Sequence, residues 1–82
     1  MKRVTRYDMN NQAMLSFCAQ QVPPHAHLPR NGTSVALYNI SDIEFVLHKK
    51  LEEFKYSTSA QQAGWKARWK HYLVILAELK EK

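Results

Sequence analysis

The sequence predicts a mainly α-helical domain of three helices, and two observations support this fold class. The stretch 64–79 repeats large apolar side chains at steps of three and four residues, which places them on one face of a helix. These side chains are Trp65, Trp69, Tyr72, Leu76 and Leu79. Glycine and proline, which disfavour helix interiors, occur only two and three times in 82 residues. We therefore expect helices near 9–21, 41–55 and 59–80.

The chain is expected to form a single domain spanning 1–82, because this length leaves too little apolar surface for a second core. Hydrophobic residues make up 45% of the sequence, as in folded proteins. The single cysteine, Cys18, excludes an internal disulfide framework. No run reaches the roughly 18–20 apolar residues of a membrane span, and no apolar segment typical of a secretory signal precedes Pro23. We therefore expect a cytoplasmic protein.

The N-terminal segment 1–7 alternates loosely and predicts either a basic arm or a short strand. Asp8 or Asn10 is the expected cap of the first helix. The pair Pro23-Pro24 should end this helix, because proline cannot donate a backbone hydrogen bond and restricts the residue before it.

The segment 23–34 contains prolines and histidines, and we expect it to form one long loop. Asn31-Gly32 marks a turn within it, because both residues tolerate positive φ. The following residues, 34–40, favour a strand and could pair with 3–7. Such a two-stranded ribbon is only marginally stable alone, so it would be a small addition that makes the fold α+β.

The segment 41–80 is expected to fold as an antiparallel helical hairpin. Ser41 and Glu44 have the spacing of a capping box, as do Ser59 and Gln62. Gly64 either permits a close approach or marks the true start of the last helix. The short connection should pack two apolar faces together. These faces comprise Leu47, Leu51, Phe54, Trp69, Tyr72 and Leu76.

The chain has a formal net charge of +5, and its unopposed cations gather near the two ends. The first cluster is Lys2, Arg3 and Arg6. The second lies at the start of the last helix and is Lys66, Arg68 and Lys70. Two basic clusters favour an anionic partner.

The sequence gives no support for catalysis, a metal site or a cofactor. Cys18, His25 and His27 lack the paired close spacings of structural zinc sites, which need about four ligands. Cys18 should be buried, where a thiol is poorly reactive. Glu52 and Glu53 are adjacent and would point about 100° apart on a helix, which is unsuited to an acid–base pair. We therefore expect a binding protein and not an enzyme.

Nucleic-acid binding is the function that the sequence favours first. The cations of both clusters could contact phosphates, and Trp65 could stack on a base if it is exposed. Against this, tryptophan at helical spacing is more often part of a core. The expected nucleic-acid-binding residues are Lys2, Arg3, Arg6, Trp65, Lys66, Arg68 and Lys70.

The alternative is a protein-binding regulatory module, in which the chain controls or inhibits a partner or forms a homodimer. Phe45 and Val74 lie off the main apolar faces of their helices and could form a second apolar patch. Small size and basic ends fit an accessory protein in either case. No membrane association is expected.

Overall fold

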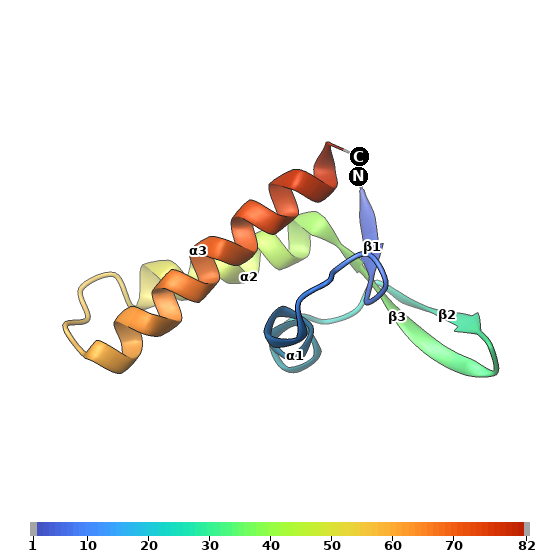
Figure 1. The fold of residues 1–82 in the computed structure, drawn as a ribbon, viewed down its shortest axis with the longest axis horizontal. Helices are drawn as coiled ribbons and strands as arrows, with labels where there is room; N and C mark the ends of the chain where they lie inside the picture. Colours follow the sequence, from blue (N-terminus) through green and yellow to red (C-terminus); the bar gives the residue numbers. More distant parts are fainter. Residues whose placement is uncertain (1, 82) are drawn as a thin grey trace.

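The computed structural model describes residues 2–81, which form six elements of secondary structure (Figure 1). The three strands are β1 (Arg3–Thr5), β2 (Ala26–Arg30) and β3 (Thr33–Asn39). The three helices are α1 (Gln12–Gln21), α2 (Ile40–Glu53) and α3 (Ala60–Lys80). They follow one another in the order β1, α1, β2, β3, α2, α3.

The prediction of a mainly α fold is wrong, because the strands form a three-stranded antiparallel sheet and the fold is α+β. The sheet has the order β1–β3–β2, with β3 in the centre. Pairing of β1 with β3 places Val4 opposite Tyr38, so the ribbon between residues 3–7 and 34–40 is present. The third strand, β2, lies within 23–34, where we expected a loop.

The β2–β3 hairpin forms because Asn31 and Gly32 make a two-residue turn. Both have positive φ, 50° and 77°, as a type I′ hairpin turn requires. The Thr33 hydroxyl donates to the Arg30 carbonyl over 2.8 Å beside this turn. Pro29 is tolerated because β2 is an edge strand. Arg30 and Thr33 pair directly beside the turn, and at the next position the nitrogen of Pro29 points away from β3, where no hydrogen bond to the sheet is lost.

The start of α1 is later than expected because Asp8 is used elsewhere. The Thr5 amide donates to the Asp8 carboxylate over 2.8 Å, which closes a turn directly after β1. Asn11 caps the helix instead, and its side chain accepts from the Met14 amide over 3.0 Å. The predicted caps Asp8 and Asn10 are therefore both wrong.

Of the two predicted helix caps, Ser59 is present at the start of α3, whereas Ser41 is not the cap of α2. Because α2 begins at Ile40, Ser41 lies inside the helix, and Glu44 binds Lys80 with an N–O distance of 2.7 Å. The predicted cap at Ser59 is confirmed, since its hydroxyl accepts from the Gln62 amide. Gly64 lies within α3, with no atom close to the position of an added Cβ, so both predicted roles for it are wrong.

The helical hairpin is confirmed, and its two helices are antiparallel (Figure 1). Glu44 near the start of α2 binds Lys80 at the end of α3. At the opposite end of the hairpin, Phe54 contacts Trp65 and Trp69, with ring centroids 5.9 and 5.5 Å apart. Full burial of a large apolar side chain contributes roughly 1.5–3 kcal/mol, and the half-buried Phe54 and Trp65 contribute less.

The core continues from the helical hairpin to α1 and one face of the sheet. Phe17 of α1 contacts Tyr72 of α3, with ring centroids 5.8 Å apart. All the buried apolar residues except Val35 form one cluster: Val4, Met9, Met14, Cys18, Val22, Tyr38, Ile40, Ile43, Leu47, Trp69, Tyr72, Leu76 and Leu79. None comes from β2, whose five residues are all exposed. The β2–β3 hairpin extends away from α2 and α3 (Figure 1).

Candidate nucleic-acid interface

Charge is divided unevenly between the two halves of the structure. The sheet half, residues 2–39, carries four cations and a single carboxylate, Asp8, and the next carboxylate in the sequence is Asp42. These cations are Lys2, Arg3, Arg6 and Arg30. Residues 40–81 carry seven lysines and arginines against six carboxylates. The sheet half is therefore the more electropositive part of the described chain.

A tight turn after β1 presents Arg6 and Tyr7 to solvent. The Asp8 amide donates to the Thr5 carbonyl over 3.0 Å, so Arg6 and Tyr7 occupy the two central positions. The Asp8 carboxylate accepts from both the amide and the hydroxyl of Thr5. Asp8, the one carboxylate of the sheet half, thus fixes the turn that presents Arg6.

Arg30 reaches this turn from the neighbouring hairpin. Its guanidinium carbon lies 4.1 Å from the centroid of the Tyr7 ring, and that of Arg6 lies 5.9 Å away. Tyr7 is 55% exposed. A cation–π contact at such a surface contributes about 0.5–1 kcal/mol. We call Arg6, Tyr7 and Arg30 the Arg–Tyr stack.

Arg3 lies on the same face of the sheet as Arg30. Arg3 is opposite Asn39 and Arg30 is opposite Thr33, and these two partners are separated by an even number of residues on β3. Arg3 is exposed, while Lys2 is half-buried and its carbonyl accepts from the Ile40 amide. Of the first predicted cluster, Arg3 therefore shares a sheet face with Arg30, although the two lie about 20 Å apart along the strand direction.

The second predicted cluster is partly engaged within the molecule. Trp65 is half-buried, and its ring contacts those of Phe54 and Trp69, with centroids 5.9 and 6.5 Å away. The Lys66 amine donates to the Ser57 carbonyl over 3.3 Å. Trp65 therefore contributes to an aromatic cluster between α2 and α3.

Arg68 and Lys70 are both exposed but point to different sides of α3. Two positions apart on a helix, they diverge by about 160°. Lys70 shares its side with Lys66, one turn earlier. Arg68 lies one helical turn before Tyr72. Burial raises the pKa of the Tyr72 hydroxyl, and the charge of Arg68 opposes this rise.

The two predicted basic clusters do not form one surface. β1 lies beside the C-terminal end of α3, whereas residues 65–70 lie toward the α2–α3 connection (Figure 1). The helix rises about 21 Å between Lys66 and Lys80. Of the first cluster, the structure brings Arg6 together with Arg30 and Tyr7, which the sequence did not indicate. The Asn-Gly turn is the signal that could have revealed them, because a hairpin there brings β2 next to β3.

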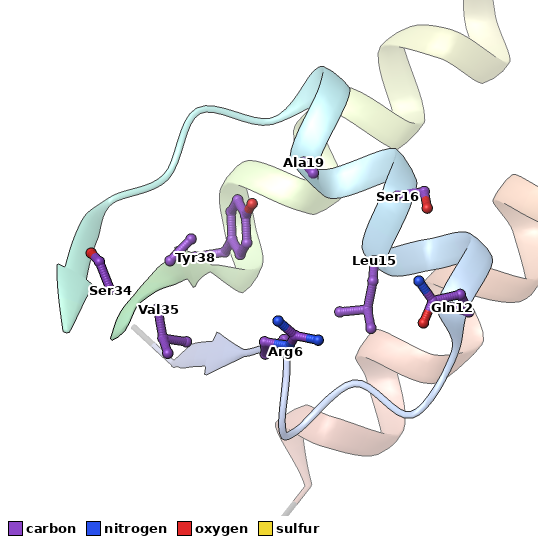
Figure 2. Close-up of a pocket in the computed structure, with 9 residues that line it drawn as sticks. Arg6, Gln12, Leu15, Ser16, Ala19, Ser34, Val35 and Tyr38 are labelled. Carbon is purple, nitrogen blue, oxygen red and sulfur yellow. The ribbon is translucent and has the colours of Figure 1, made fainter. Parts of the chain in front are cut away.

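A groove lies between α1 and β3 (Figure 2), and Arg6 of the Arg–Tyr stack is part of its lining. Its volume is about 310 Å³. Leu15 extends from α1 toward Arg6 and Tyr38 on the other side of this space (Figure 2). The lining residues are Arg6, Gln12, Leu15, Ser16, Ala19, Ser34, Val35, Ala36 and Tyr38. Arg6 is the single charged residue among them.

The residues considered for catalysis or metal binding lie apart or are buried. Cys18 is buried as predicted, and burial raises the pKa of its thiol to about 11. The thiol is therefore protonated at neutral pH. His25 contacts Asn39, with 3.2 Å between Nδ1 and Nδ2. Across residues 2–81, no three histidine, cysteine or acidic side chains gather closely enough to hold a metal ion.

Comparison with known proteins adds no functional assignment. No protein-family model, no curated protein and no solved structure matches the chain. Among the helices described here, none is long and apolar enough to cross a membrane.

Proposed function

We propose that the protein binds nucleic acid through its sheet half, with Arg3, Arg6 and Arg30 contacting phosphates. The observation that carries the proposal is the Arg–Tyr stack, which presents two guanidinium groups at an exposed tyrosine. No acidic residue occurs between Asp8 and Asp42 to oppose an approaching polyanion. Phosphate contacts of this kind supply most non-specific affinity for nucleic acids.

Stacking on Tyr7 prepares Arg30 for such a contact. A guanidinium lying over an aromatic ring keeps its N–H donors at its edge, where they can bind two phosphate oxygens together. The ring also restricts the side chain before binding, which lowers the entropy lost when the contact forms. The turn closed by Asp8 restricts the backbone of Arg6 in the same way.

Salt dependence of binding tests the proposal. Fluorescence anisotropy of labelled 20-nucleotide strands and duplexes should show affinity falling as salt is raised from 50 to 200 mM. With Lys2 and the three arginines all neutralising phosphates, the slope of log affinity against log salt would be at most about −3.6 for duplex and −2.8 for single strands. The double variant Arg6→Ala/Arg30→Ala should halve this slope.

The matched control is Lys66→Ala/Lys70→Ala, which removes the same charge from the opposite end of the molecule. We expect the affinity of this variant for nucleic acid to stay within about threefold of that of the unmodified protein. Salt screens the interaction between these distant exposed lysines and phosphates bound at the sheet half. Absence of binding at 50 mM salt would refute the proposal. Equal losses in both double variants would also refute it, because net charge alone would then explain the affinity.

Protein binding is the second candidate, and two exposed apolar side chains favour it. Phe45 is 68% and Val74 54% exposed. Each is two positions from buried residues of its own helix, so each points about 160° away from the core. Because α2 and α3 pack through their buried faces, Phe45 and Val74 lie on opposite outer sides of the helical hairpin. Self-association that is insensitive to salt and lost in Phe45→Glu would support this candidate.

A further inference from the structure

The groove between α1 and β3 has the size and access of a small-ligand site. Its volume of about 310 Å³ lies at the lower end of the range for such sites, roughly 300–1,000 Å³. Exposed residues of α1, including Gln12 and Ser16, form part of its lining. Tyr38 and Leu15 face each other across the space between β3 and the helix (Figure 2). A flat group could therefore enter between the helix and the strand.

The groove combines apolar walls with neutral polar groups. Leu15, Val35 and Ala36 supply apolar surface, while Gln12 and Tyr38 supply an amide and a hydroxyl. Within residues 2–81 the side chains of Gln12 and Tyr38 take part in no hydrogen bond, so both can serve a ligand. A nucleobase has the matching chemistry, with apolar faces and an edge of donors and acceptors.

Arg6 connects this groove to the proposed phosphate-binding surface. It is the one charged residue of the lining and also belongs to the Arg–Tyr stack. No carboxylate lines the groove, so nothing there repels a phosphate. A nucleotide could therefore insert its base beside Leu15 while its phosphate binds the Arg6 guanidinium.

We infer that the groove holds one unpaired nucleobase, so that the protein prefers single-stranded nucleic acid to duplex. This inference rests on the proposed function. Paired bases in a duplex keep their faces stacked and their Watson–Crick edges engaged. Insertion from a duplex therefore requires unpairing and unstacking, whereas a single strand presents its bases directly.

A comparison of three labelled oligonucleotides at 50 mM salt tests the inference. They are a 20-nucleotide strand, the corresponding duplex and an abasic strand that has the same phosphates but no bases. We expect the base-bearing strand to bind about tenfold more tightly than the abasic one, since stacking and edge contacts are lost with the base. The duplex should also bind more weakly than the base-bearing strand.

Two conservative variants locate the effect in the groove. Gln12→Ala and Tyr38→Phe remove hydrogen-bonding groups without changing charge, and each should reduce the preference for the base-bearing strand. Gln20→Ala is the matched control, because Gln20 is another exposed amide of α1 but does not line the groove. Circular dichroism would verify that all three variants retain the thermal transition of the unmodified protein.

The outcomes separate this inference from the proposed function. Salt-dependent binding that is equal for all three oligonucleotides would refute the base-binding groove and leave the phosphate surface intact. Failure of all three to bind would refute both. NMR provides a second measurement: a nucleoside monophosphate should shift the Gln12 side-chain amide. An equal shift with inorganic phosphate would overturn the inference, because the groove would then be an anion site only.

Discussion

Ionisation of the Cys18 thiol should destabilise the protein at alkaline pH. The side chain is fully buried, and burial raises the pKa of its thiol from 9.0 to about 11. The thiol has a higher pKa in the folded state than in the unfolded state. The stability that the buried, protonated thiol provides is therefore intact below pH 9 and is lost as the pH rises through 11. A tenfold change in an ionisation constant corresponds to about 1.4 kcal/mol, so the full loss is about 3 kcal/mol.

Urea unfolding followed by tryptophan fluorescence would measure this loss. The experiment compares the unmodified protein with Cys18→Ala at pH values from 7 to 10.5. Burial also raises the pKa values of Tyr38 and Tyr72, so both proteins should lose stability in alkali. The difference between the two free energies of unfolding isolates the thiol. It should change by about 1.4 kcal/mol between pH 7 and pH 10.

The direction of that change is as informative as its size. The variant has no thiol to ionise, so its stability relative to the unmodified protein should improve as the pH rises. A difference that stays constant from pH 7 to pH 10 would refute the reasoning, since the thiol would then ionise equally in the folded and unfolded states. Thiol reagents should agree, reacting slowly with the folded protein at pH 8 and rapidly after unfolding.

Three substitutions test the packing and the hairpin turn. Leu76→Ala should lower the free energy of unfolding by about 3–5 kcal/mol, because Leu76 is fully buried between elements of the core; a loss below 1 kcal/mol would contradict this packing. Gly32→Ala should cost about 1–2 kcal/mol through its positive φ, and hydrogen exchange should detect fraying confined to the β2–β3 hairpin. Gly64→Ala should instead raise stability by about 1 kcal/mol, since Gly64 lies inside α3 with open space around it; a fall in melting temperature would contradict this.

The helices were predictable because their signals are local. The spacing of Trp65, Trp69, Tyr72 and Leu76 identified the buried face of α3, and Ser59 identified its start. The capping box at Ser41 failed because tertiary context overrode it. Asn39 ends the central strand, and the chain enters the helix directly at Ile40, one residue before the expected cap.

The sheet was harder to predict because β2 lacks the usual pattern of a strand. It contains Pro29, and all five of its residues are exposed, so no alternation of apolar and polar residues marks it. Only the Asn31-Gly32 turn indicated a hairpin. Prolines at 23, 24 and 29 favoured a loop, yet Pro29 is compatible with an edge strand.

The candidate site was only partly predictable, because Arg30 belongs to the strand β2 that the sequence pattern did not reveal. Arg3 and Arg6 stood out because residues 1–7 carry cations and no acid. Their relation to Arg30 depends on pairing between segments far apart in the sequence, which charge counting cannot reveal. The half-buried position of Trp65 likewise depends on Phe54 across the helical hairpin.

The placement of β1 at the edge of β3 has a consequence for how the chain folds. β2 and β3 can pair as soon as their two-residue turn closes, and α2 and α3 are also neighbours in sequence. β1 must instead wait for β3, because Thr5 pairs with the distant Leu37. Closing that long loop costs more entropy than either local step. During synthesis β1 leaves the ribosome before β2 and β3, yet it is expected to be the last of the three to join the sheet.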